Sequence, residues 1–240
     1  MAETAEILCL VNSRRRNGRS VAGLRTDGGG WIRPIGMAGD GTLLRSHCRL
    51  ADSSEPRLFD ILRIGLHRPA PKSYHPESWC IDGTPWELQA RPGNSELIAG
   101  LLQTHTRFGP GLLGSTTNRI MPQAFAALAH PASLGIVQPQ TFRWRIATGR
   151  SDLPSLRAIF ALRGNITYDL PVADPDWEKR LRALPVGDYP MDIDEPSATP
   201  GSKAPLPSLV VSLTEPTGSS GMCYKFVAAV LASPGIPSVL

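Results

Sequence analysis

Proline and glycine recur along the whole chain and limit the length of any helix. The sequence has 23 Gly and 23 Pro among 240 residues, and proline is roughly twice as frequent as in average proteins. Because both residues interrupt helices and favour turns, this composition favours short strands joined by many turns. With 41% apolar residues, the chain can still bury a core. We therefore expect a mainly β fold with a few short helices.

The first part of the chain reads as a series of strands. Residues 6–13 form an apolar run, residues 19–26 alternate between polar and apolar, and residues 31–35 follow the turn sequence TDGGG. The Asn-Gly dipeptide at 17–18 is typical of a hairpin turn. These segments predict a three-stranded meander, to which residues 58–66 add a fourth strand. The proline-broken sequence that follows predicts a loop.

The middle of the chain has helical features. Residues 94–105 open with Asn-Ser as an N-cap and place leucines at helical spacing, and residues 121–131 predict a short helix stopped by proline. After residue 134 the sequence returns to strands. One helix interrupts them at 174–184, where Asp174 is the predicted N-cap and proline occupies the first helical position.

Several segments, taken in order, are similar to those of the bacterial dual OB-containing domain family. They include ILCLVNSRRRNGRSVAG, LGSTTNRI, YDLPVADPDW and CYKFVAAVL, and they span almost the whole chain. The resemblance implies an α+β chain, mainly β, with two OB-like β-barrels. We place the first barrel at 1–92, a helical connector at 93–132 and the second barrel at 133–240, with a Pro/Ser-rich loop at 190–207. OB folds usually bind oligonucleotides or oligosaccharides across one sheet face and its flanking loops.

The charged residues suit a polyanionic partner. The net charge is +4, and arginine far outnumbers lysine. Arginine contacts phosphate with two parallel hydrogen bonds and stacks on bases, so this preference fits a nucleic-acid partner. A GC-rich genome would produce the same preference without any such function.

The densest basic segment lies in the first predicted hairpin and is the main candidate site. Three arginines fall at the end of the first strand and in the turn, where they would reach a phosphate backbone. On the third strand a tryptophan and an arginine two positions apart share one face, which would stack a base and hold its phosphate. Alternatively, the arginines are solvated and the tryptophan belongs to the core. The predicted contacts are Arg14, Arg15, Arg16, Arg19, Trp31 and Arg33.

Four further residues complete the predicted site. Tyr74 and Trp79 would line the same groove, or would anchor their proline-rich loop onto the barrel. Arg119 ends the polar sequence STTNR, which would present backbone N–H groups to a phosphate or would simply cap a helix. Lys225 lies between Tyr224 and Phe226 on a predicted strand, so its side chain would face away from both aromatics, toward solvent.

The sequence contains no recognisable catalytic motif and no zinc-site spacing of Cys and His. We expect no cofactor. The first residues do not resemble a signal peptide, and no apolar stretch approaches the ~18 residues that cross a bilayer. We expect a cytoplasmic protein with free thiols and no membrane partner.

These features together predict a nucleic-acid-binding protein, for single-stranded DNA or RNA, rather than an enzyme. One alternative is an enzyme or sensor that holds a nucleotide-like phosphate ligand between the barrels. Another is an adaptor subunit that docks onto a protein partner in a nucleic-acid-processing or defence complex.

Overall fold

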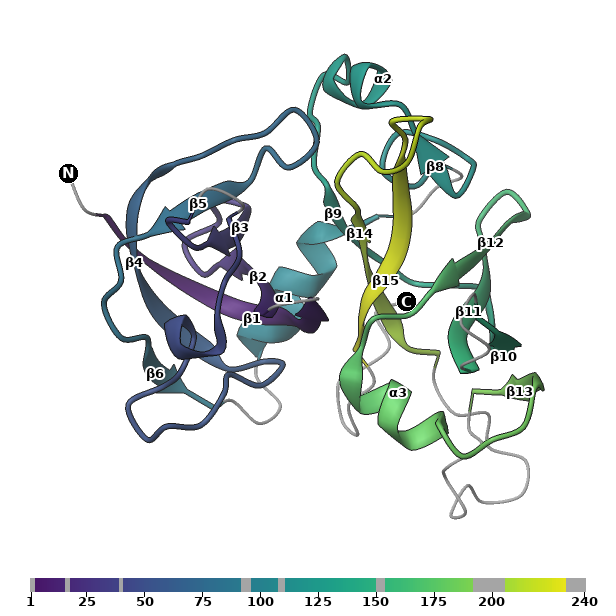
Figure 1. The fold of residues 1–240 in the computed structure, drawn as a ribbon, viewed down its shortest axis with the longest axis horizontal. Coiled ribbons are helices and arrows are strands. Elements are labelled where there is room, and N and C mark those ends of the chain that lie inside the picture. Colours follow the sequence, from purple (N-terminus) through teal and green to yellow (C-terminus); the bar gives the residue numbers. More distant parts are fainter. Residues whose placement is uncertain are drawn as a thin grey trace.

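The computed structural model describes residues 3–15, 18–38, 41–91, 96–107, 111–149, 154–191 and 206–231. Within these ranges the chain forms two groups of strands that lie side by side, with three short α-helices (Figure 1). The predicted mainly β fold with two OB-like barrels is confirmed. No helix in these ranges is long and apolar enough to cross a membrane.

The first barrel is a closed ring of strands. It consists of β1 (Glu3–Arg15), β2 (Gly18–Arg25), β3 (Trp31–Ile35), β4 (Ile61–Pro69) and β5 (Ser78–Ile81). Antiparallel pairs join β1 to β2, β2 to β3, β1 to β4 and β4 to β5, and the parallel pair of β3 with β5 closes the ring. The edge strand β6 (Glu87–Ala90) pairs with β4. A 3-10 helix, η1 (Arg45–His47), lies in the long connection between β3 and β4.

The predicted meander of three strands is confirmed by β1, β2 and β3. The fourth strand begins at Ile61 rather than at residue 58, because Phe59 adopts a left-handed backbone conformation (φ 70°) that interrupts extended structure. The predicted loop after this strand is shorter than expected. Its first residues extend β4 to Pro69, where the missing N–H is tolerated at a strand end, and Ser78 already begins β5.

Two helices and two very short strands connect the barrels: α1 (Glu96–His105), β7 (Thr106–Arg107), β8 (Arg119–Ile120) and α2 (Pro122–Ala126). The two predicted connector helices are therefore present, and α2 is shorter than predicted. Helix α1 buries Ile98, Leu101 and Leu102 in an apolar cluster that both barrels share. The domain boundaries at residues 92 and 132 remain a prediction.

The second barrel is built from a four-stranded sheet and a five-stranded sheet. Its elements are β9 (Leu134–Val137), β10 (Thr141–Thr148), β11 (Pro154–Leu162), β12 (Ile166–Pro171), α3 (Pro175–Leu181), β13 (Gly187–Pro190), β14 (Ser208–Leu213) and β15 (Cys223–Leu231). β10, β11 and β12 form a meander, β14 pairs with β9 and β15, and β13 pairs with β10. A parallel bridge from Val172 to Val227 joins the end of β12 to β15. Of the predicted loop at 190–207, residues 192–205 lie outside the described residues.

Helix α3 begins as predicted. The Asp174 carboxylate accepts hydrogen bonds from the backbone N–H groups of Asp176 (3.0 Å) and Trp177 (3.3 Å), and proline follows at the first helical position. Trp177 is buried and packs against Trp144, with ring centroids 4.7 Å apart. The helix therefore covers one end of the second barrel.

Candidate nucleic-acid interface

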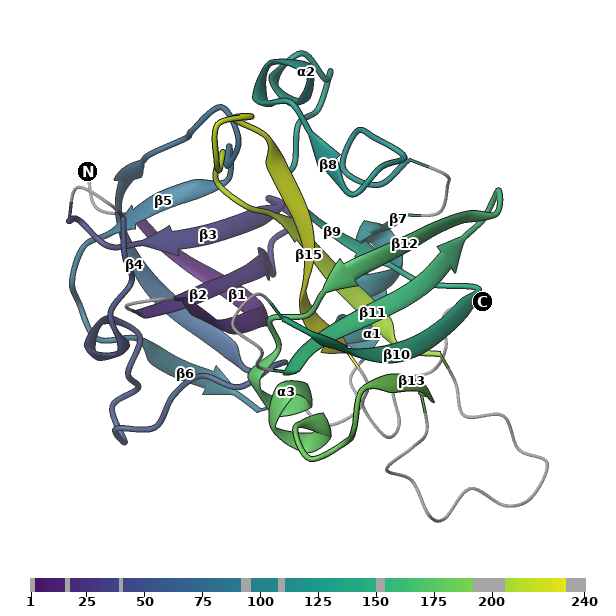
Figure 2. The ribbon, with the colours of Figure 1, turned by 45° about the vertical axis from the view of Figure 1, so that its right-hand side comes forward.

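The outer face of β1, β2 and β3 is covered by the second barrel. Figure 2 shows β15 running between the two groups of strands. One apolar cluster joins this face to the second barrel, and it contains Leu8, Leu10, Ala22, Leu24, Leu134, Ile136, Val210, Ala228 and Ala229. Trp31 is half-buried against this cluster. The predicted base-stacking tryptophan therefore packs between the barrels, and not in the core of the first barrel as its alternative interpretation had it.

Arg33 lies in the same interface and is only 6% exposed. Its Nε donates to Glu77 Oε1 (3.0 Å), and its Nη2 donates to Ser133 Oγ (3.1 Å) and Ser212 Oγ (3.0 Å). The two serines belong to the second barrel, and Ser133 also donates to Glu77. Trp31 and Arg33 do point toward one side of β3, as predicted. That side is the contact between barrels, so the prediction of Arg33 as a phosphate contact is not compatible with its burial.

Two titratable groups beside Arg33 have shifted pKa values. Burial alone would raise the pKa of Glu77, but the charge of Arg33 and the hydrogen bond from Ser133 outweigh it, and the pKa is lowered. The Nε2 of His75 donates to the Leu213 carbonyl oxygen (2.9 Å) across the interface. Burial, together with the nearby charge of Arg33, lowers the pKa of His75 to about 4. His75 is therefore neutral at pH 7 and holds the barrels together through a hydrogen bond.

Acidification from pH 6.5 to pH 5 is expected to destabilise the protein through His75. Its unfolded side chain binds a proton with an ordinary pKa near 6.5, whereas the folded one does so only near pH 4. The unfolded state then binds more protons, so the free energy of unfolding falls by about 1–2 kcal/mol over this range. Urea unfolding at each pH should show a smaller pH slope for His75→Gln. His67→Gln, at an exposed histidine, is the control and should keep the wild-type slope. An equal slope in wild type and both variants would contradict the assignment of the pH effect to His75.

The predicted loop aromatics pack against protein. Tyr74 is half-buried against a small cluster around Phe125, with its ring edge on His75 (4.9 Å between centroids) and Lys72 5.8 Å from its centre. Trp79 is half-buried against the core of the first barrel. Both arrangements are those of aromatic side chains that anchor a loop.

Lys225 is buried rather than solvent-facing, at 1% exposure, so the predicted orientation is wrong. Its Nζ donates to Ser115 O (2.7 Å), Ser115 Oγ (2.8 Å) and Thr117 O (2.6 Å), and lies 5.2 Å from the Tyr168 ring centre. Burial lowers its pKa to about 7. Lys225 thus fastens the STTNR loop to β15, and its ammonium group is not open to a phosphate.

Arg119 is exposed in β8, paired with Tyr224 of β15. The hydroxyls of Ser115 (2.9 Å) and Thr117 (2.7 Å) both donate to its carbonyl oxygen, which closes the loop on itself. The side-chain amide of Asn118 donates to Asp169 O (3.0 Å) and ties the loop to β12. Arg119 therefore lies beside the sheet of the second barrel.

The basic hairpin is partly accessible. Arg14 is exposed on β1 and lies opposite Arg19 on β2. Arg19 is half-buried and pairs with Glu55, which also pairs with Arg45. The Arg15 side chain and all of Arg16 lie outside what the structure describes, so their role as contacts remains a prediction.

An open cleft of about 690 Å³ separates this hairpin from the second barrel. The first barrel contributes Arg14, Arg19, Arg57 and Phe59 to its lining, and the second contributes Lys179 and Ala228. Arg57 and Lys179 are exposed. Arg14 and Arg19 of the hairpin therefore line a cleft between the barrels.

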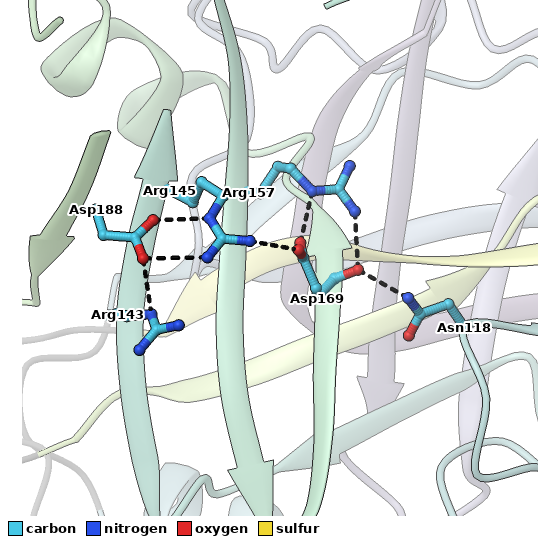
Figure 3. Close-up of polar contacts among 6 residues, drawn as sticks. All are labelled: Asn118, Arg143, Arg145, Arg157, Asp169 and Asp188. Atoms are coloured by element: carbon cyan, nitrogen blue, oxygen red, sulfur yellow. Dashed lines mark hydrogen bonds and ion pairs between the residues drawn. The ribbon is translucent and has the colours of Figure 1, made fainter. Parts of the chain in front are cut away.

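The equivalent sheet of the second barrel is exposed and carries a row of arginines (Figure 3). Arg145 on β10 donates two hydrogen bonds to Asp188 on β13 (2.7 and 3.1 Å) and one to Asp169 on β12 (3.1 Å). Arg157 on β11 donates to the carboxylate of Asp169 (2.5 Å) and to its carbonyl oxygen (2.9 Å). Arg143 pairs with Asp188 at 3.3 Å. Two carboxylates thus hold three guanidinium groups side by side.

The side chain of Arg143 is 52% exposed, and its Nη1 and Nη2 atoms have no partner among the described residues. Hydrogen bonds from Arg145 hold the pKa of Asp188 below its ordinary value, so both partners stay charged at neutral pH. The face therefore offers oriented N–H donors and guanidinium planes to solvent.

The predicted site did not include Arg143, Arg145 or Arg157. The sequence FRWRIA contains the pattern that would have found the first two, because strict alternation around the buried Trp144 places both arginines on the opposite face. Arg57 and Lys179 at the cleft have no comparable pattern, since each is a single basic residue in an ordinary surface segment.

The sequence model of one family, described as the dual OB-containing domain, matches residues 5–230. Comparison with curated proteins and with solved structures found no match. The match covers both barrels and the connector. The chain therefore belongs to the dual OB-containing domain family.

Proposed function

We propose that the protein binds single-stranded nucleic acid, DNA or RNA, on the exposed sheet face of its second barrel. The observation that supports it is the row formed by Arg143, Arg145 and Arg157 across β10 and β11 (Figure 3). OB folds bind oligonucleotides across one sheet face and its loops. In the first barrel that face is covered by the second barrel, whereas in the second barrel it is open to solvent.

The chemistry of this face suits a flexible strand. The two unpartnered Nη atoms of Arg143 would donate to phosphate oxygens, and Arg119 adds an exposed positive charge beside the sheet. Guanidinium planes held in place by carboxylates offer stacking surfaces to unpaired bases. Because the carboxylates fix the arginines beforehand, less side-chain entropy is lost on binding.

Replacing Arg143 by glutamine is expected to weaken oligonucleotide binding by about threefold to tenfold. Loss of one phosphate contact should also reduce the slope of log K against log salt by about 0.7 for a single strand. Fluorescence polarisation of labelled single-stranded and duplex DNA and RNA at several salt concentrations measures both quantities. Arg63→Gln is the matched control, because Arg63 is also an exposed strand arginine (49%) with an ion pair of 3.3 Å.

Arg14→Gln in the same titrations tests whether the hairpin, rather than the sheet face, contacts the oligonucleotide. If Arg143→Gln binds like wild type while Arg14→Gln loses affinity, the nucleic acid contacts the hairpin and not the proposed face. Absence of salt-dependent binding to every oligomer would contradict nucleic-acid binding altogether.

A further inference from the structure

The cleft between the barrels has the size of a small-molecule site. Its volume of about 690 Å³ falls within the roughly 300–1,000 Å³ typical of ligand pockets. It is built by segments from both halves of the chain: the end of hairpin β1–β2 and residues 54–59 on one side, helix α3 and the end of β15 on the other. Sites of this kind occur preferentially where two domains meet.

The cleft is lined by four basic residues, Arg14, Arg19, Arg57 and Lys179, and by three acidic ones, Glu55, Asp174 and Asp176. Glu55 pairs with Arg19 and Arg45. The Asp174 carboxylate accepts from three backbone N–H groups, those of residues 176, 177 and 230. Arg57 and Lys179 form no ion pair with a described residue. Asp176 is exposed in the same lining, and the charge of Arg14 acts on the carboxyl group of Glu178. Basic residues therefore exceed acidic ones in the lining by one, and both barrels contribute basic side chains.

Apolar surface and backbone strain lie beside these cations. Leu58, Phe59 and Ala228 line the same cleft. Phe59 has φ 70°, a conformation unusual for a bulky residue, and its N–H donates to Cys9 O (2.7 Å), which holds it there. Such strain persists where surrounding structure imposes it and is concentrated at functional sites.

Two polar atoms of the cleft-lining residues lack partners. Asn12 donates through Nδ2 to Pro56 O (2.7 Å), while its buried Oδ1 accepts no hydrogen bond from the described residues. Arg19 Nε is likewise buried without an acceptor. Unpartnered buried polar atoms are costly and uncommon. Both residues line the cleft, and each has one polar atom whose hydrogen-bonding capacity is unused.

We infer that this cleft binds a mononucleotide, at a site separate from the sheet face. Arg14, Arg57 and Lys179 supply the charge that recognises a phosphate group. The ring of Phe59 and the small Ala228 supply apolar surface for a flat base. Because the two barrels contribute to one ligand site, binding would also tighten their packing.

The test uses the full-length protein with adenosine diphosphate as the probe, and with pyrophosphate and adenosine alone as partial ligands. Isothermal titration at low salt should give saturable binding of the diphosphate, tighter than that of either partial ligand. Arg57→Gln and Lys179→Gln should each weaken it by about tenfold, the effect of losing one charge-assisted hydrogen bond. Arg182→Gln removes the same charge just beyond helix α3, outside the cleft lining, and should bind like wild type.

Equal affinity for pyrophosphate and the diphosphate would overturn the nucleotide assignment and leave an anion site. No saturable binding of any of the three probes, or binding insensitive to both cleft variants, would overturn the site itself. Neither result depends on oligonucleotide binding, which is measured separately through Arg143→Gln. The cleft variants could lose oligonucleotide binding while Arg143→Gln retains it. That result would show that the cleft binds part of an oligonucleotide, and it would also overturn the inference.

Discussion

Replacing Arg33 by methionine is expected to destabilise the protein by about 3–5 kcal/mol. Both partners of its ion pair are more than 90% buried, with side-chain exposures of 8% for Arg33 and 7% for Glu77. Removing one partner of a buried pair leaves the other charge uncompensated, which is the costly outcome. Arg33 also donates to serines of the second barrel, so the loss falls on the contact between the barrels.

Urea unfolding of Arg33→Met and of the double variant Arg33→Met/Glu77→Met tests this reasoning. The double variant should recover most of the lost stability, because no buried charge remains unpaired. Arg25→Met is the control: Arg25 pairs with Glu3 and Asp27 on the surface of the same barrel, and surface pairs contribute little. If Arg33→Met costs no more than Arg25→Met, Arg33 does not hold the barrels together.

The contact between barrels is the part of the structure that sequence patterns could not predict. Alternation in β3 correctly places Trp31 and Arg33 on one side of the strand. What covers that side depends on Ser133 and Ser212, which lie 100 and 179 residues away in the chain. A polar and an aromatic residue on one strand face look the same whether water, nucleic acid or a second barrel covers them.

Local patterns predicted the elements whose formation depends on local interactions. The Asp174 cap satisfies backbone N–H groups two and three residues further on, so its sequence pattern suffices. The strands β5, β6 and β13 were not predicted. Each has four residues, too few to show a period of two, and each is defined by the longer strand with which it pairs.

The candidate site also contains residues that local patterns predict and residues that they do not. Arg143 and Arg145 follow from alternation around a buried tryptophan, so a stricter use of strand periodicity finds them. The cleft brings Arg57 of the first barrel near Lys179 of the second. Their proximity depends on how the two barrels pack, and no pattern within either segment indicates it.

Replacing Lys225 by methionine is expected to cost about 2–4 kcal/mol at pH 7. The change removes three hydrogen bonds from the ammonium group to Ser115 and Thr117, and bonds to charged donors are worth more than neutral ones. It also removes the side-chain attachment of the STTNR loop to β15, while the backbone pairing of Arg119 with Tyr224 stays. Chemical unfolding measures the loss. Unchanged stability would mean that the cost of burying the ammonium group cancels its hydrogen bonds.

The pH dependence of stability in wild type and Lys225→Met separates the cost of burying the ammonium group from the gain of its hydrogen bonds. Burial lowers the pKa of Lys225 to about 7, whereas the unfolded side chain keeps its proton up to about pH 10.4. Between these values the unfolded state binds more protons, so wild-type stability should rise relative to Lys225→Met by up to about 1.4 kcal/mol per pH unit from pH 7 to 9. The three oxygen acceptors favour the charged form and oppose this shift. If the difference in stability between wild type and Lys225→Met does not change with pH, the three acceptors outweigh the effect of burial, and Lys225 remains an ammonium ion inside the barrel.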